Sequence, residues 1–177
     1  MSIRRLLHSD APPAPPLKFV LLSSFGALIA IAITGGLSVL SGIPWLMAPF
    51  GASCVLAFGV PDSPLAQPRA IVGGHLVATA VGLAVVTLLG DSWLACAVGV
   101  ALALAVMQVT RTVHAPAGAD PLVVIMAHAP LSYLVSPVLV GSLVIVLTAW
   151  AVNNLRSSRS YPKQPEQPAG RYGKGCR

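Results

Sequence analysis

The stretch from Phe19 to Pro61 contains no formally charged side chain. A helix needs roughly 20 apolar residues to cross a bilayer, so this stretch is long enough for two passes. Only 9% of the whole chain is charged, against about 25% in a typical soluble domain. The mean hydropathy of +0.81 agrees with this reading. The sequence therefore predicts an integral membrane protein that crosses the bilayer several times.

Six hydrophobic segments can be marked by the Pro, Gly and charged residues between them. They cover about residues 18–40, 45–60, 70–89, 93–110, 117–129 and 133–153. Their interiors are rich in Leu, Val, Ala and Ile, without the ten-residue polar–apolar alternation of a membrane β-barrel. We predict an all-α membrane protein with four long segments and two that are short or re-entrant.

Two polar interruptions resemble each other. Pro49-Phe50-Gly51-Ala52-Ser53 and Pro116-Ala117-Gly118-Ala119-Asp120 lie 67 residues apart, and each opens one of the short segments. The similarity continues downstream, where Pro68 corresponds to Pro137 and Gly73 corresponds to Gly141 at nearly the same spacing. Repeated broken helices are typical of transporters built from inverted repeats. We therefore expect two pseudo-symmetric, inverted halves of three segments each.

Two membrane layouts fit this pattern. If all six segments cross, both termini, Arg69 and Arg111 share the cytoplasmic face, as the positive-inside rule favours. If the two short segments are re-entrant, four segments cross and both arginines move to the outer face. The fifth segment, of about 13 residues, is below the usual spanning length. Charge favours six crossings, whereas segment length favours four.

The positive residues near the ends of the chain predict orientation and domain organisation. Lys and Arg occur before the first apolar run and after the last, which favours a bacterial inner-membrane protein with both termini cytoplasmic. The sequence has no basic stripe interleaved with aromatic residues, so it does not suggest nucleic-acid binding. We expect a Pro-rich disordered lead over 1–17, a transmembrane domain over 18–153 and a basic disordered tail over 154–177.

The two short segments are the first candidates for a binding site. A helix N-terminus presents unpaired N–H groups and partial positive charge, so it can hold an anion. Gly51 and Gly118 would allow close approach to the backbone, and Ser53 adds a hydroxyl group. Asp120 departs from this pattern, because a carboxylate there would compensate the dipole and compete with an anion. The alternative is that Pro and Gly only start and pack the helices.

Three further side chains could act on a substrate. Arg69 presents a permanently charged planar fork that suits small oxyanions, although it could equally anchor the chain at the interface. His75 and His114 could orient a substrate or carry a coupled proton. An interhelical hydrogen bond is the alternative role for His75, since polar groups inside a membrane need partners.

Enzymatic and cofactor chemistry find no support in the sequence. No Ser-His-Asp pattern, HExxH or GxxxxGK motif is present. Cys54, Cys96 and Cys176 are scattered, and the histidine spacings match no metal motif. We expect no catalytic residues, no metal and no cofactor.

The motifs resemble the HPP family of integral membrane proteins. The residues that carry the resemblance are Ala48 to Ser53, the SPLAQPR stretch from Ser63 to Arg69, Gly73-Gly74-His75, and His114 to Ala119. The family is named for a His-Pro-Pro motif, where this chain reads His114-Ala115-Pro116. The family is usually described with four membrane segments, and its plastid and cyanobacterial members are implicated in nitrite transport.

The resemblance implies a transporter or channel for a small inorganic anion, with nitrite as the leading substrate. The candidate substrate-binding residues are Gly51, Ser53, Arg69, His75, His114, Gly118 and Asp120. The expected partners are the anion, the lipid bilayer and further copies of the chain in a homo-oligomer. The alternative function is a non-transporting membrane scaffold or assembly protein, which would use the same Pro and Gly residues for tight helix packing.

Overall fold

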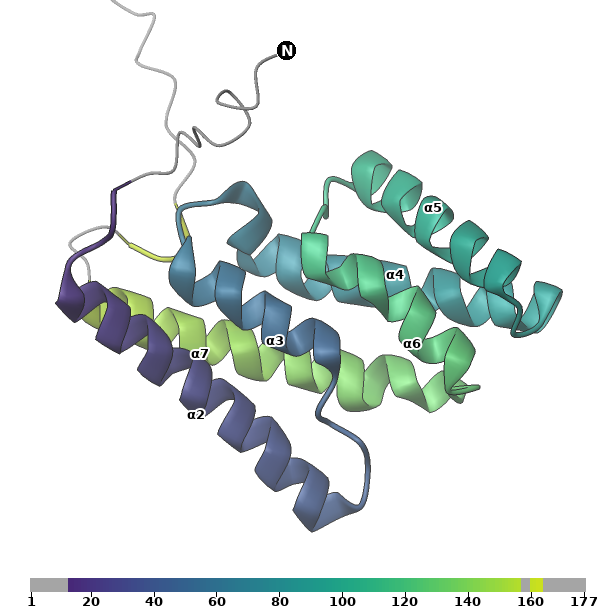
Figure 1. The fold of residues 1–177 in the computed structure, drawn as a ribbon, viewed down its shortest axis with the longest axis horizontal. Coiled ribbons are helices and arrows are strands. Elements are labelled where there is room, and N and C mark those ends of the chain that lie inside the picture. Colours follow the sequence, from purple (N-terminus) through teal and green to yellow (C-terminus); the bar gives the residue numbers. More distant parts are fainter. Residues whose placement is uncertain (1–12, 157–159, 164–177) are drawn as a thin grey trace, which may run out of the picture.

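The computed structural model describes residues 13–156 and 160–163, and every regular element in this part of the chain is helical (Figure 1). The four long helices are α2 (Leu17–Ser41), α4 (Pro68–Leu89), α5 (Trp93–Thr110) and α7 (Val140–Arg156). The apolar run that contains α7 begins earlier, so the fourth candidate span covers Leu131–Leu155. The predicted all-α fold with four long apolar segments is confirmed.

The two short segments are also helical. The first is α3 (Ala48–Cys54), which continues as a wider π-type turn, η1 (Val55–Gly59). The second starts with a 3-10 turn, η3 (Ala115–Ala119), and continues as α6 (Asp120–Met126). Both runs, Ala48–Gly59 and Ala115–Met126, are apolar but shorter than the four candidate spans. The remaining turns are η2 (Pro64–Ala66), η4 (Leu131–Leu134) and η5 (Val135–Leu139).

Local sequence explains where the long helices begin and end. Pro68 occupies the first turn of α4, where a missing N–H costs nothing, so this helix starts two residues before the expected boundary. The Ser92 hydroxyl accepts a hydrogen bond from Ala95 N and caps α5. α2 ends at Gly42, whose φ of 70° is a left-handed conformation that glycine adopts without strain.

Successive helices run in roughly opposite directions, and the short helices α3 and α6 lie alongside the long helices α7 and α4 (Figure 1). At one end, called here the Tyr161 end, the Tyr161 hydroxyl donates to Ala66 O and Arg69 Nη2 donates to Thr110 O. At the opposite end, the Asp91 end, His128 Nε2 lies 3.1 Å from Asp91 Oδ2. The ends of the long helices thus gather at two opposite sides of the bundle.

Each helix of one half has the same kind of neighbours as the corresponding helix of the other half. α4 packs on α5 and α6 of the second half, and α7 packs on α2 and α3 of the first half. α4 and α7 also contact each other, and α3 contacts η3, so both pairs join the halves at the centre. The last helix of each half is therefore embedded in the other half.

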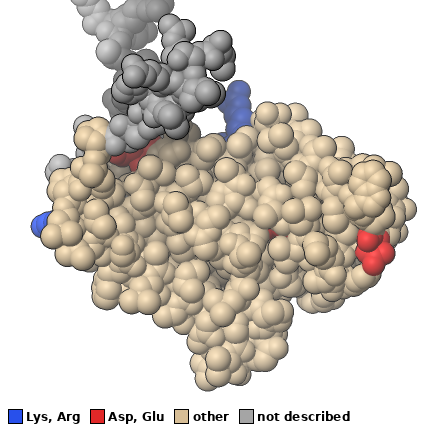
Figure 2. Space-filling view, in the orientation of Figure 1, with Lys and Arg blue, Asp and Glu red and all other residues tan. Residues whose placement is uncertain are grey.

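The outer helices α2 and α5 expose most of their surface. Only 17% of the apolar window of α2 and 22% of that of α5 is buried, against 44% for α4 and for the span containing α7. Large apolar side chains such as Leu21, Leu28 and Leu102 are exposed on them, and such a surface suits contact with lipid tails. Figure 2 shows one face of the molecule, almost without charged atoms except at its margins.

Most of the expected N-terminal lead and C-terminal tail lies outside the described residues. The described part of the tail includes Tyr161, which is buried. Its backbone N–H donates to Asn154 Oδ1, and its hydroxyl bonds Ala66 O. Residues 160–163 thus pack against the end of the helical domain.

Candidate functional site

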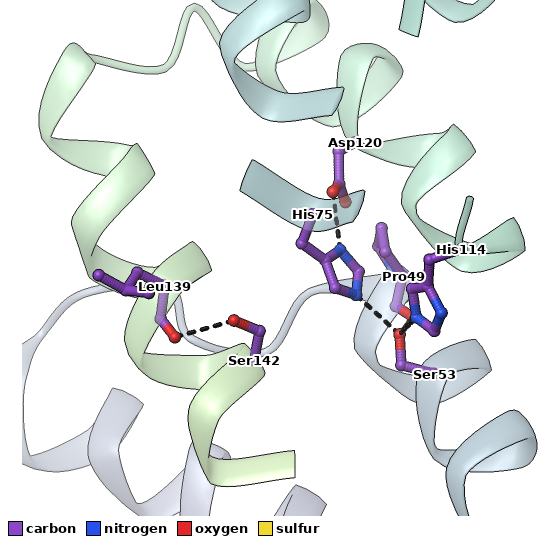
Figure 3. A network of polar contacts seen from close by, with 7 residues as sticks. All are labelled: Pro49, Ser53, His75, His114, Asp120, Leu139 and Ser142. Carbon is purple, nitrogen blue, oxygen red and sulfur yellow. Dashed lines mark hydrogen bonds and ion pairs between the residues drawn. The ribbon is translucent and has the colours of Figure 1, made fainter. Parts of the chain in front are cut away.

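Four polar side chains meet in the interior where the two halves join (Figure 3). Ser53 comes from α3, His75 from α4, His114 from the residue before η3, and Asp120 from the first turn of α6. All four are 0% exposed. Buried ionisable groups in a membrane domain are costly unless they have partners, so their convergence marks this region as the candidate site.

These side chains form one continuous series of hydrogen bonds. Asp120 Oδ2 lies 2.7 Å from His75 Nδ1, and His75 Nε2 lies 2.8 Å from Ser53 Oγ. Ser53 Oγ lies 2.8 Å from His114 Nε2, and His114 Nδ1 lies 2.7 Å from the carbonyl oxygen of Leu65. We call the four side chains and the Leu65 carbonyl group the polar network.

Ser53 is the junction of the network. Its Oγ contacts both Nε2 atoms and also lies 3.0 Å from Pro49 O, one turn earlier in the same helix. A hydroxyl group has one proton to donate and two lone pairs to accept with. The hydroxyl can therefore satisfy all three neighbours only if both imidazoles donate to it.

Small residues let the segments come close enough for these contacts. A methyl group on Gly74 would lie 2.6 Å from His114 Cβ and 2.8 Å from Thr112 O. One on Gly82 would lie 2.7 Å from Pro121 Cα, next to Asp120. Both glycines are on α4, so this helix can hold His75 against the segment that carries His114 and Asp120.

Aromatic packing restrains the imidazole rings. The Phe50 ring meets the His75 ring edge-on, with a centroid distance of 5.2 Å and an interplanar angle of 90°. The two histidine rings are 5.0 Å apart at 68°. Edge-to-face arrangements of this kind are favourable, and they hold both imidazoles beside Ser53.

Two polar atoms beside the network are unpaired within the described part of the structure. Asp120 Oδ1 and Thr79 Oγ1 are both buried, and neither makes a hydrogen bond of normal geometry there, although the two side chains are neighbours. Thr79 lies one turn after His75 on α4. A buried oxygen without a hydrogen bond is unfavourable in a native structure, and strain, a chemical role or a bound water can account for it.

The other predicted site residues lie apart from the polar network. Gly51 is exposed, whereas Phe50, Ser53 and Cys54 of the same helix are buried. Gly118 is half-buried in η3 between His114 and Asp120. A methyl group on Gly51 or Gly118 would meet no atom within 4 Å, so space is open beside both backbones.

Arg69 is exposed at the Tyr161 end, where its Nη2 donates to Thr110 O at 3.0 Å. It is the second residue of α4, just after the segment that supplies the Leu65 carbonyl group. The structure thus brings Ser53, His75, His114 and Asp120 together, while Arg69 lies outside this contact.

Sequence reasoning missed three members of the site. The Leu65 and Pro49 carbonyl groups belong to the backbone, so no residue type could reveal them. Thr79 follows His75 at a one-turn spacing, a signal that the sequence contained. Within the described residues, no group of three or more His, Cys, Asp or Glu side chains is arranged to hold a metal ion.

Comparison with known proteins agrees with this architecture. The chain is 36% identical over 163 residues to a protein of Dictyostelium discoideum named only as a transmembrane protein, which covers 85% of this chain and 57% of that protein. A second transmembrane protein of the same organism is 40% identical over 150 residues, covering 80% of this chain and 48% of its own length. The chain thus spans about half the length of these relatives.

No solved structure matches the chain. Residues 12–162 match the family described as HPP, transmembrane region. This range includes the four candidate spans, both short helices and every member of the polar network. The chain is therefore an integral membrane protein and belongs to the HPP transmembrane family.

Proposed function

We propose that this HPP-family protein is a transporter or channel for a small inorganic anion, with nitrite as the leading substrate. The observation that carries the proposal is the fully buried polar network between the two halves of an otherwise apolar membrane domain. A packing role alone would be served by apolar side chains, which avoid the cost of burying ionisable groups. Short helices that meet at the centre of a pseudo-symmetric membrane protein are also typical of transport sites.

The donors of the network suit a small oxyanion. The imidazole N–H groups of His75 and His114 and the hydroxyl group of Ser53 could turn toward an anion that enters between the halves. Charge-assisted hydrogen bonds from protonated histidine would strengthen such binding. The open space beside Gly51 and Gly118 allows approach to the backbone of both short helices. Nitrite is preferred because of the resemblance to family members implicated in its transport.

Arg69 would attract the anion at the mouth of the pathway on the Tyr161 end. Its exposed guanidinium group lies at the Tyr161 end, close in sequence to the loop that contacts His114. A permanent planar cation can attract nitrite before the ion loses its hydration shell.

We further propose that the Tyr161 end faces the cytoplasm in a bacterial inner membrane. Arg69, Arg111 and Lys163 lie at this end, and the positive-inside rule places such residues in the cytoplasm. A cysteine introduced beside Arg69 should be labelled only from the cytoplasmic side. Labelling only from the periplasm would overturn this orientation. We expect the domain to form a homo-oligomer.

The alternative function is a membrane scaffold. The observation that favours it is the series of small residues on the packing faces of the outer helices, such as Gly26 and Ala30 of α2 and Gly99 and Ala103 of α5. Such residues promote close helix association without any transport. A scaffold should lose folding when these positions are enlarged and should tolerate Arg69→Gln.

Uptake of nitrite into proteoliposomes tests the proposal, with nitrate and formate measured beside it. Arg69→Gln is the test variant. Arg111→Gln is the matched control, because Arg111 is also exposed near the same end but directly follows α5. We expect saturable nitrite flux that is lost in Arg69→Gln and retained in Arg111→Gln. Absence of flux for all three anions, with folded and inserted protein, would contradict transport and favour the scaffold.

A further inference from the structure

The hydrogen-bond partners of the polar network determine how many protons it holds. A carbonyl oxygen can only accept, so His114 Nδ1 must donate to Leu65 O. A neutral His114 then has a bare Nε2 atom that can only accept from Ser53 Oγ. The protonation of His75 and Asp120 follows from what Ser53 can do with its single proton.

Two neutral histidines and an ionised Asp120 do not fit these contacts. An ionised Asp120 requires His75 to donate from Nδ1, which leaves a bare Nε2 atom on His75 as well. Ser53 would then face two acceptor nitrogens, each at 2.8 Å, with one proton between them. One of these two contacts would bring two lone pairs together, so the network lacks a proton in this state.

One additional proton satisfies all four contacts of the series. With this proton on Asp120, the carboxyl group donates to His75 Nδ1, His75 Nε2 donates to Ser53, and Ser53 donates to His114 Nε2. With the proton on His75, Asp120 is ionised and accepts from His75 Nδ1, while the two bonds of Ser53 keep their directions. With the proton on His114, Ser53 turns and donates to His75 Nε2. The network is electrically neutral in each case, as a buried site requires.

We propose that the polar network is a proton-binding relay that couples one proton to each monovalent anion moved by the protein. This proposal rests on the proposed transport function and adds its coupling ion. In the transfer step, Asp120 Oδ2 gives its proton to His75 Nδ1, His75 Nε2 gives its proton to Ser53 Oγ, and Ser53 Oγ gives its own proton to His114 Nε2. Asp120 ends as a carboxylate and His114 as an imidazolium, and no other covalent bond changes.

The coupling to an anion follows from what happens when the neutral network binds a second additional proton. If both imidazoles are doubly protonated, each Nε2 donates to Ser53, and the Ser53 hydroxyl donates to Pro49 O at 3.0 Å. This state uses every observed contact, including the one that the neutral network leaves unmade. With Asp120 ionised it carries one net positive charge in an apolar interior, and a bound monovalent anion would neutralise that charge.

The surroundings of the relay contain few other groups that could hold the proton. Thr79 of α4 places a buried hydroxyl group beside Asp120, and Tyr133 of η4 contributes a buried phenol that is uncharged near neutral pH. Arg69 lies outside the polar network, since its side chain bonds Thr110 O. The unpaired Asp120 Oδ1 atom is a further acceptor through which a proton or water could reach the network.

Nitrogen NMR of ¹⁵N-histidine-labelled protein in bilayers tests the bound proton without any transport assay. We expect His114 to carry a proton on Nδ1. We also expect the additional proton to appear in one of two ways: as a proton on His75 Nε2, or as a proton shared between the two rings. Assignment uses His75→Gln and His114→Gln. Two neutral rings, both protonated only on Nδ1, would show that the network holds no additional proton and would overturn the proposal.

Flux measurements test the coupling. For one proton per anion, a gradient of about one pH unit supports an accumulation of about tenfold. A membrane potential alone should leave uptake unchanged, because a proton and a monovalent anion together carry no net charge. We expect Asp120→Asn to lose the pH-driven accumulation, since an amide can donate to His75 but cannot exchange the proton.

Ser142→Ala is the matched control. Ser142 is also a fully buried serine, but its hydroxyl bonds Leu139 O in its own segment (Figure 3), and pH-driven accumulation should persist in this variant. Anion flux that follows potential and ignores the pH gradient would overturn the coupling and leave the transport function standing. Absence of any flux, with the NMR result as expected, would refute the transport function and the coupling while leaving the proton site.

Discussion

The two halves of the domain share a frame and differ in chemistry. A constant spacing of 67 residues relates four pairs of positions: Pro49 and Pro116, Ser53 and Asp120, Gly74 and Gly141, and His75 and Ser142. The proline and glycine pairs are identical, because they start and pack helices in equivalent places. The polar pairs differ, so the chemical groups do not follow the repeat.

The result is one polar site in a molecule whose packing would allow two. His75 on α4 reaches across to Asp120 and Ser53, whereas Ser142 on α7 bonds only to Leu139 O in the contacts described. His114 corresponds by the same spacing to Met47, which is apolar. The frame can thus keep its symmetry, since packing depends on shape, while the ionisable groups gather at one of two equivalent interfaces.

The largest difference between the halves should appear at the pair His75 and Ser142. His75→Leu leaves Asp120 buried without its partner, and breaking a buried pair in this way costs about 3–5 kcal/mol. Ser142→Ala removes a single local hydrogen bond and should cost about 1 kcal/mol. Thermal unfolding in detergent measures both. Equal losses would mean that the two positions are energetically equivalent after all.

A second comparison concerns the glycines. A methyl group on Gly141 would overlap the buried Phe50 ring, so Gly141→Ala should destabilise the domain by about 1–3 kcal/mol. Gly51→Ala meets open space in α3 and should stabilise it by about 0.5–1 kcal/mol, because alanine is the better helix former. Unfolding curves of the two variants should move in opposite directions. Two destabilised variants would show that the space beside Gly51 is occupied in the membrane.

The smallest effect on stability should come from the two boundary arginines. Arg69→Gln loses an exposed hydrogen bond to Thr110 O, worth about 0.5–1 kcal/mol at most. Arg111→Gln changes an exposed residue at the end of α5 and should stay within about 0.5 kcal/mol of the parent. The same unfolding assay applies. A loss of several kcal/mol in Arg69→Gln would make any loss of flux in that variant a folding defect.

The helical fold could be predicted because it depends on local patterns. The long uncharged runs and the Pro and Gly residues between them located all six segments. Most boundary errors were of about two residues, as at Pro68, where proline starts the helix earlier than the apolar run suggested. The direction of the short helices could not be fixed in advance, since charge and segment length favoured different layouts.

The site was only partly predictable. Ser53, His75, His114 and Asp120 were each selected from their positions in the motifs, but residues as far as 61 apart in sequence meet at Ser53. Asp120 was interpreted as a competitor of the anion at a helix start, and its pairing with a histidine of the other half depends on tertiary packing. The role of Arg69 and Gly51 in binding stays a prediction.

The last acceptor of the network, the Leu65 carbonyl group, has a consequence for sequence variation. Every residue type, proline included, carries this group, so a point mutation at position 65 cannot delete it. A longer or shorter loop between Pro61 and Pro68 could move it away from His114. Variation in length at this loop should therefore alter the network more than variation in residue type at position 65.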